Sequence, residues 1–205
     1  MPSSPVHMKV AYILSDKLGI ENRSDFLLGA ISPDCVNLGT DHASEELRYG
    51  AHIRVRDYNI WKENLKKFYL ENKEKYSDCI DYLKGYLFHM YTDIAWDEVV
   101  QPELFKYLET CGYGYDDMTA QKWQELYRFN GVLVKEDYWK EACELVKNGT
   151  PRDIATCTAK LVEGYRDYVV CDYKDKIKSQ PPEFLSDKHI DMTIEQMLKM
   201  GYTDF

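Results

Sequence analysis

Residues 78–100 read DCIDYLKGYLFHMYTDIAWDEVV and carry apolar side chains around much of a helical circumference. A helix of this kind belongs at the centre of a bundle rather than on its surface. Ser77 is placed to cap the helix, and Pro102 follows its end. Gly85 lies one turn before His89, so we expect another helix or a ligand to approach closely where the side chain is missing.

The rest of the chain is also patterned as helices. No strand-type alternation of useful length occurs, and we find no internal repeat or low-complexity segment. The sequence therefore predicts an all-α, single-domain helical bundle over residues 1–205. The other predicted helices cover about 6–18, 24–32 with Ser24 as its cap, 44–72, 102–111, 119–128 with Thr119 as its cap, 137–148, 153–173 and 193–200.

Composition excludes several classes of protein. The chain has 205 residues, 44% of them hydrophobic, with 26 Lys and Arg against 35 Asp and Glu for a net charge of −9. This balance argues against wholesale disorder, an extended nucleic-acid surface and a polybasic membrane binder. No apolar stretch approaches the roughly 20 residues of a transmembrane segment, and the first residues do not form an export signal. We expect a cytoplasmic protein, while the oligomeric state is not readable from the sequence.

The cysteines do not form a metal or redox motif. No two have C-x-x-C spacing, so neither a thiolate zinc site nor a thioredoxin-like motif is indicated. Without an export signal, the favoured interpretation is six reduced thiols that are mostly buried as small apolar groups. They are Cys35, Cys79, Cys111, Cys143, Cys157 and Cys171.

Five residues form a candidate metal constellation. His89 and Asp93 are four apart, which places both on one face of a helix at a spacing that can serve a single metal ion. Asp34 follows a proline at a predicted helix exit, His52 lies in the first turns of the predicted helix 44–72, and His7 lies near the chain start. Taken singly, these residues are more simply explained as a buried His–Asp pair, a loop acid and ordinary helical histidines.

Taken in order, the same residues resemble the zinc-dependent phospholipase C family, in particular its short intracellular bacterial branch. The resemblance is carried by MPSSPVH (1–7), FLLGAISPD (26–34), AH (51–52) and GYLFHMYTDIAWDE (85–98), all within residues 1–101. It implies an all-α bundle that supports up to three zinc ions and is similar in fold to the fungal single-strand nucleases.

The resemblance also assigns roles. Asp34, His52, His89 and Asp93 look like the ligands of one zinc ion, and Asp93 looks like a bridge to a second ion that His7 helps to bind. Asp34 would double as the catalytic base. The implied function is zinc-dependent hydrolysis of a small phosphoester, most naturally a phosphodiester such as a phospholipid headgroup, with metal-activated water. Two zinc ions would reverse the local charge, so the net charge of −9 does not argue against one bound phosphate group.

The sequence departs from the family pattern in two places. Secreted members use the amino group and carbonyl of a processed N-terminal Trp as ligands, where this chain begins with Met1. They also use two later histidines and a glutamate, whereas the only histidine after His89 is His189. We therefore expect the third zinc site to be absent. Asp97 and Glu98 could substitute in part, although a solvent-facing acidic pair is the simpler interpretation.

Three other interpretations stay open. The chain could be a metal-binding helical protein without hydrolase activity, or a helical interaction module in which the five residues are incidental. Phosphohydrolases with a His-Asp dyad are a weak match, because this chain has only the reverse order, Asp41-His42. His42 is expected in a loop and His189 at the surface.

Overall fold

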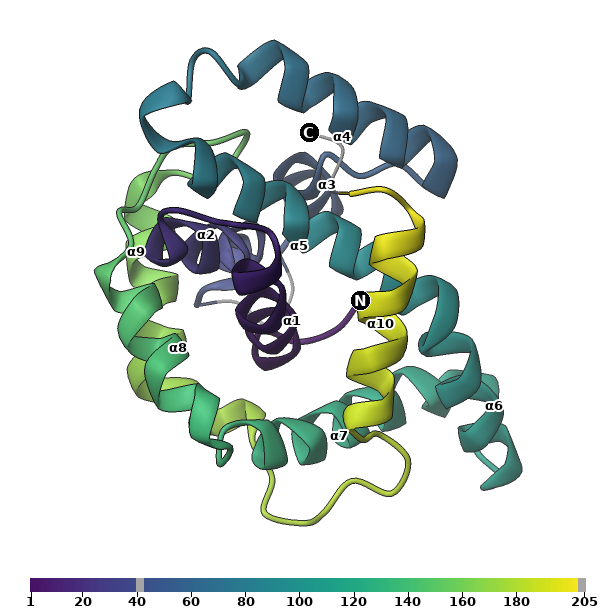
Figure 1. Cartoon of the computed structure of the whole chain (residues 1–205). Helices are drawn as coiled ribbons and strands as arrows, with labels where there is room; N and C mark the ends of the chain where they lie inside the picture. Colours follow the sequence, from purple (N-terminus) through teal and green to yellow (C-terminus); the bar gives the residue numbers. More distant parts are fainter. Residues whose placement is uncertain (40–42, 203–205) are drawn as a thin grey trace.

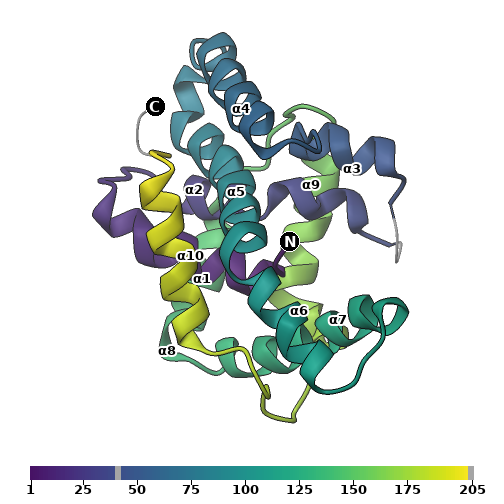
Figure 2. The same ribbon diagram turned by 90° about the vertical axis from the view of Figure 1, so that its right-hand side faces the viewer.

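Helix α5 (Ile80–Val99) is the central element of the fold. Sixteen of its 20 residues are buried, on every side of the helix. In the computed structural model, α1 (Ser4–Lys17) and α2 (Arg23–Gly29) lie beside α5, and the other helices are arranged around these three (Figures 1 and 2). The prediction of a central helix at residues 78–100 is confirmed.

The structure describes residues 1–39 and 43–202. Within these ranges every regular element is helical, apart from an isolated bridge between Ile154 and Cys157, which confirms the predicted all-α class. The remaining helices are α3 (Glu45–His52), α4 (Tyr58–Asn72), α6 (Gln101–Thr110), α7 (Tyr115–Leu133), α8 (Asp137–Asn148), α9 (Ala159–Asp167) and α10 (Asp187–Lys199), with short helical segments at η1 (Ser32–Asn37), η2 (Ser77–Cys79), η3 (Tyr168–Asp172) and η4 (Tyr173–Lys176).

Two glycines let α2 and α5 cross in close contact. A Cβ atom on Gly85 would lie 2.0 Å from the carbonyl oxygen of Phe26, and one on Gly29 would lie 2.4 Å from the carbonyl oxygen of Tyr82. Both distances are far below van der Waals contact, so no other residue fits without a shift of backbone. The close approach predicted at Gly85 is therefore confirmed, and the partner is a helix.

The predicted helix 44–72 is two helices. The chain adopts left-handed backbone at Ile53, with φ of 49°, directly after α3 ends at His52. Asp57 then caps α4, because its carboxylate accepts hydrogen bonds from the backbone N–H groups of Asn59 and Ile60. As a result, His52 lies in the last turn of a short helix rather than in the first turns of a long one.

Several predicted boundaries are also wrong. Asn22, not Ser24, caps α2, since its side chain accepts a hydrogen bond from the N–H of Asp25. Thr119 lies inside α7, which begins four residues earlier. The predicted helix 153–173 is reduced to α9, followed by a π-helical turn at η3 and a 3-10 turn at η4.

The histidines outside the constellation have different outcomes. His189, expected at the surface, is buried at 3% exposure. Its Nδ1 accepts a hydrogen bond from the backbone N–H of Ser186, within the capping box that begins α10. A capping role therefore explains this residue. His42 and its neighbour Asp41 lie outside the described residues.

The helices and the cysteines agree with the remaining expectations about membrane segments and thiols. None of the helices within residues 1–39 and 43–202 has both the length and the apolar character of a bilayer-crossing segment. All six cysteines are free thiols and four of them are buried, as predicted, while Cys111 and Cys171 are exposed.

Candidate metal centre

Five side chains from four elements meet on one side of α5. His89 and Asp93 are separated by one turn of α5, His7 comes from α1, Asp34 from η1 and His52 from the end of α3. The ligand atoms of His7, His89 and Asp93 all lie within 4.8 Å of one another, and so do those of Asp34, His52 and His89. His89 is thus common to two groups that could each hold a metal ion.

Backbone carbonyls set the tautomers of two of these histidines. The Nδ1 atom of His52 lies 2.8 Å from the carbonyl oxygen of Arg48, and that of His89 lies 2.8 Å from the carbonyl oxygen of Ala30. A carbonyl only accepts, so each Nδ1 atom carries the hydrogen, and Nε2 of the neutral ring has a free lone pair. Ala30 follows α2 directly, so the glycine crossing places the group that orients His89.

The two Nε2 atoms face each other at 3.2 Å. Two lone pairs at this distance repel unless a cation lies between them, and the cation can be a proton or a metal ion. The rings are held in place by packing: His7 stacks on His89 with centroids 3.7 Å apart and an interplanar angle of 11°, while His52 meets His89 edge to face. The arrangement is therefore rigid and leaves the lone pairs directed at a common point.

Asp93 is a fully buried carboxylate to which no described group donates a hydrogen bond. Its Oδ1 atom lies 3.4 Å from Nε2 of His7, and its Oδ2 atom lies 3.8 Å from Nε2 of His52 and 3.7 Å from Nε2 of His89. A buried charge without donors is costly unless a cation compensates it. The two oxygens also point at different histidines, which is the arrangement of a carboxylate that bridges two ions.

The carboxyl groups of the cluster are held in their charged forms. Burial pushes the pKa of Asp93 upward, but in the acid range where this carboxyl group titrates, His89, His7 and His52 are protonated, and their attraction outweighs burial and holds the pKa well below its usual value. The pKa of Asp34 is also lowered, because the hydrogen bond from His52 and the attraction of protonated His89 in the same acid range outweigh burial. Both aspartates are therefore anionic at neutral pH, as a metal ligand must be.

The two facing imidazoles differ in their affinity for a proton. Burial, aided by the charge on His7, lowers the pKa of His89 to about 3, so its ring is neutral. Burial also lowers the pKa of His52, but the hydrogen bond to Asp34 and the charge on Asp93 outweigh burial and raise it. In the metal-free protein the bridging proton therefore belongs to His52, and a metal ion would displace it.

The distances suit a small tetrahedral cation. A zinc ion with bonds of about 2.1 Å holds its ligand atoms about 3.4 Å apart. The contacts of His52 with His89 and Asp34 are 3.2 and 3.6 Å, and that of His89 with Asp93 is 3.7 Å. Neutral imidazole and carboxylate are donors that zinc and several other transition ions accept. The residues present therefore fit a metal ion, and their chemistry does not distinguish among these metals.

Asp34 forms the open edge of the cluster. Its side chain is 16% exposed, whereas the side chains of His7, His52, His89 and Asp93 are each exposed by 2% or less. The Nδ2 atom of Asn37 donates a long hydrogen bond of 3.4 Å to Asp34 Oδ1. Asp34 is therefore the member of the cluster that solvent reaches most readily.

Asp97 and Glu98 do not extend the cluster. Asp97, expected in a solvent-facing pair, is 8% exposed and accepts from the Met1 amino group and, at 3.2 Å, from the Tyr58 hydroxyl. Glu98 accepts from Lys62 at 3.2 Å and from the side chain of Gln196 at 2.6 Å. Both carboxylates are therefore engaged by other groups, and the substitution suggested for them has no structural support.

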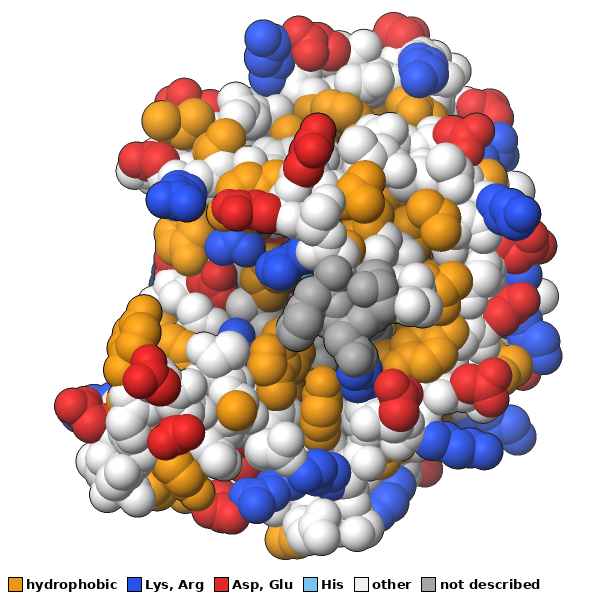
Figure 3. Space-filling view, turned by 180° about the vertical axis from the view of Figure 1, so that it is seen from behind, with side chains coloured by type: hydrophobic (Ala, Val, Ile, Leu, Met, Phe, Trp, Pro, Cys, Tyr) orange, Lys and Arg blue, Asp and Glu red, His pale blue; other side chains and the backbone are white. Residues whose placement is uncertain are grey.

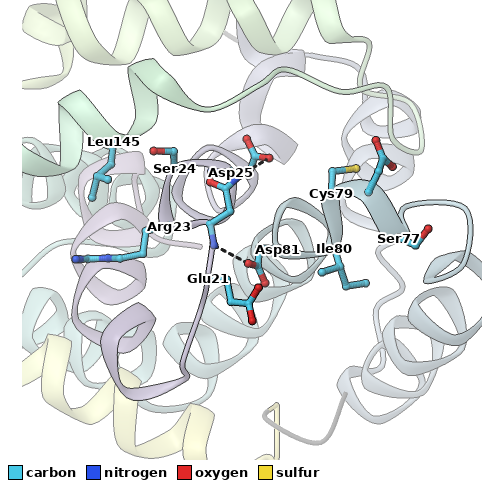
Figure 4. Close-up of a pocket in the computed structure, with 11 residues that line it drawn as sticks. Glu21, Arg23, Ser24, Asp25, Ser77, Cys79, Ile80, Asp81 and Leu145 are labelled. Atoms are coloured by element: carbon cyan, nitrogen blue, oxygen red, sulfur yellow. Dashed lines mark hydrogen bonds between the residues drawn. The ribbon is translucent and has the colours of Figure 1, made fainter.

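A separate pocket of about 660 Å³ lies at the other end of the two central helices, near the start of α2 and of α5 (Figure 4). Its lining includes Asn22, Asp25, Asp81 and Cys79, and none of the five cluster residues. The pocket and the candidate metal centre are therefore separate features, and only the cluster carries the donor set of a metal site.

Comparisons with known proteins give no assignment. No family model matches the chain, no curated protein matches it, and no solved structure matches it. The family interpretation therefore rests on the sequence motifs, and the capacity to hold a metal ion rests on the geometry of the cluster.

Proposed function

We propose that this protein is a zinc-dependent hydrolase of a phosphoester, of the phospholipase C type that the motifs resemble. The observation that carries the proposal is the centre of the cluster, where the Nε2 lone pairs of His52 and His89 face each other at 3.2 Å beside the donor-free carboxylate of Asp93. The same residues also match the motifs of a zinc enzyme. A bound metal ion explains both the facing histidines and the buried carboxylate, which would otherwise need separate explanations.

The residues divide into two ligand groups. Asp34, His52, His89 and one oxygen of Asp93 would hold the first ion, and His7 with the other oxygen of Asp93 would contribute to a second. Zinc bound there supplies Lewis acidity toward phosphate oxygens and lowers the pKa of water to about 7. Asp34 is anionic and lies at the open edge, so it is suited to accept the proton of an attacking water.

The substrate class follows from the resemblance. We propose a small phosphoester, most naturally a phosphodiester such as a phospholipid headgroup, bound at a single phosphate. The cytoplasmic location belongs to the same proposal and is supported by six free cysteines.

One observation favours the alternative of a metal-binding protein without hydrolase activity. Four of the five cluster side chains are exposed by 2% or less, and the pocket of about 660 Å³ does not reach them. A structural metal site is closed in this way, whereas a catalytic site keeps one position open.

A combined metal and activity measurement separates these functions. We expect wild-type protein to contain zinc and to hydrolyse bis-p-nitrophenyl phosphate or a phospholipid with an uncharged headgroup such as phosphatidylglycerol, and His89→Ala to lose both properties. Single-stranded DNA is the third substrate, because the resemblance extends to nucleases. Full zinc occupancy without turnover on any substrate would favour the metal-binding alternative. Equally low zinc in wild type and His89→Ala would show that the metal site does not exist.

A further inference from the structure

Arg54 lies next to the metal cluster with an incompletely paired guanidinium group. Its Nη2 atom is 3.9 Å from Oδ2 of Asp97, one turn beyond Asp93 on α5, and its Nη1 atom contacts the sulfur of Met1. The Nε atom is buried and has no hydrogen-bond partner among the described residues. The guanidinium of Arg54 therefore has N–H donors that its contacts within the protein do not use.

Lys122 brings a second cation to the same end of α5. Within the described part of the chain, its ammonium makes one hydrogen bond, of 3.4 Å, to the side chain of Gln101, which also accepts from the Met1 amino group. Burial lowers the pKa of Lys122, while the charges on Asp97 and Asp93 oppose this effect. Hydrogen bonds from Lys122 to Gln101, and from the Met1 amino group to both Gln101 and Asp97, connect this ammonium to the Asp97 side of the cluster.

These cations make the site positive. One divalent ion and the protonated Met1 amino group, which pairs with Asp97, balance the carboxylates of Asp34, Asp93 and Asp97, and Arg54 and Lys122 then bring the net charge to +2. On the face of the molecule in Figure 3, Lys and Arg side chains lie interspersed with Asp and Glu side chains, so positive charge at one place depends on individual residues rather than on a broad basic surface. A positive site attracts an anion that the metal alone, among three carboxylates, would hold less well.

We propose that Arg54 and Lys122 bind the non-bridging oxygens of the substrate's phosphoryl group and select a phosphoester with a neutral or anionic headgroup. This inference rests on the proposed function. An arginine fork matches phosphate oxygens bidentately, and a lysine adds a compact point charge. In this way two side chains contribute positive charge in a chain whose sequence lacks the ligands of a third metal ion.

The aromatic surroundings of Arg54 support the headgroup selection. The guanidinium lies 5.3 Å from the ring centroid of Trp61 and 5.6 Å from that of Tyr49. Aromatic faces of this kind bind quaternary ammonium groups when they are free. Here a side chain of the protein already occupies them, and its charge repels a second cation, so a choline headgroup is disfavoured.

Calorimetric titration with inorganic phosphate tests the inference separately from activity. Phosphate is titrated into wild type, Arg54→Gln, Arg54→Lys, Lys122→Gln and the control Lys84→Gln, each with zinc and after metal removal. Lys84 lies on α5 near the opposite end and pairs with Asp81 at 3.1 Å, so its loss removes an equal charge from elsewhere. We expect Arg54→Gln and Lys122→Gln to weaken phosphate binding at least about 10-fold, Arg54→Lys to restore part of it, and the control to bind normally.

The outcomes separate this inference from the proposed function. Zinc content and turnover of wild type decide the function. Phosphate binding that is absent in wild type, or equal in wild type and both charge-removing variants, would overturn the role of Arg54 and Lys122 whether or not zinc is bound. Glycerol 3-phosphate and phosphocholine complete the test, since we expect glycerol 3-phosphate to bind wild type more tightly, and the reverse order would overturn the headgroup selection.

Discussion

The central helix carries three buried aspartates, Asp81, Asp93 and Asp97, and the first two have opposite surroundings. Asp81, at the pocket shown in Figure 4, is 5% exposed and accepts from the backbone N–H of Asn22 at 2.8 Å and from Lys84 at 3.1 Å. Its neighbour Asp25 accepts from the N–H of Thr150 at 2.8 Å. Asp93, at the other end, is buried completely and faces only histidine nitrogens, without a described hydrogen-bond donor.

This difference distinguishes a structural carboxylate from a ligand. The N–H groups around Asp81 and Asp25 satisfy their charges within the protein, so these residues join helices and need no further partner. The nearest nitrogens of His52 and His89 instead lie 3.8 and 3.7 Å from Oδ2 of Asp93, beyond hydrogen-bond distance, and so do not satisfy this carboxylate. Asp81 and Asp93 are similar in burial and charge. Their hydrogen-bonding neighbours distinguish the structural role of Asp81 from the metal-ligand role proposed for Asp93.

The strongest test of the comparison replaces one carboxylate with an amide, either Asp93→Asn or Asp81→Asn. We expect Asp93→Asn to lose zinc and Asp81→Asn to retain it. Zinc at 1,000 times its dissociation constant stabilises a folded protein by about 4 kcal/mol, so wild type and Asp81→Asn should gain this increment and Asp93→Asn should gain almost none. Denaturant unfolding with and without zinc measures the effect.

Asp81→Asn is also the control for nonspecific damage, because it removes a buried charge from the same helix. Without zinc we expect it to be destabilised, since it weakens two hydrogen bonds to a charged acceptor, each worth about 2 kcal/mol. Equal zinc-dependent stabilisation of both variants would remove the distinction between the two carboxylates.

The second test acts on the close crossing of α2 and α5 at Gly85. A methyl group at Gly85 would lie 2.0 Å from the carbonyl oxygen of Phe26, so Gly85→Ala forces α2 away from α5. We expect the free energy of unfolding to fall by about 3 kcal/mol. Because Ala30 follows α2 and holds Nδ1 of His89, zinc affinity should fall as well.

Gly114→Ala is the matched control for this substitution. No atom lies within 4 Å of the position of its added Cβ, and its φ of −75° suits any residue. We expect a change below about 1 kcal/mol. If Gly85→Ala is as stable as wild type, α2 and α5 can separate without cost. The predicted link between their close crossing and the zinc affinity of the cluster would then be wrong.

The fold was largely predictable because its strongest signals are local. An apolar circumference over residues 78–100 predicts a buried helix, and a glycine within it predicts a close crossing. Helix ends were predicted less well. Ile53 breaks the predicted helix 44–72 in left-handed backbone, which a β-branched residue rarely adopts, and only the capping potential of Asp57 signalled a new start.

The site was predictable only in part. Helical spacing places His89 and Asp93 on one face, whereas the association of His7, Asp34 and His52 with them came from a family resemblance and is a matter of tertiary packing. Arg54 and Lys122 were missed, because Lys122 comes from a helix in the second half and no periodicity links it to the cluster. His189 was misjudged since a histidine that caps its own helix has no signature distinct from a surface histidine.

The smallest expected effect is a pH dependence that isolates His89. In the metal-free protein, burial together with the nearby charge on His7 lowers the pKa of His89 to about 3 from an ordinary 6.5. Below pH 6.5 this residue is therefore protonated in the unfolded chain and stays neutral in the native state. Stability therefore falls on acidification, by about 2 kcal/mol between pH 6.5 and 5. His89→Asn, which keeps a donor for the carbonyl of Ala30, should have a smaller slope than wild type in urea unfolding at a series of pH values. Burial also lowers the pKa of His189, so that residue contributes the same remaining slope to both proteins.

The other cluster groups act in different pH windows, which makes the measurement specific. The pKa of His52 is raised, so its stabilising contribution is complete below pH 6.5 and is lost as the pH rises through the native pKa. Asp34 and Asp93 have lowered pKa values, so their contributions are complete above about pH 4 and are lost only in stronger acid. If the slope between pH 5 and 6.5 is equal in wild type and His89→Asn, His89 is not its source, and the neutral imidazole beside Asp93 no longer distinguishes this carboxylate from Asp81.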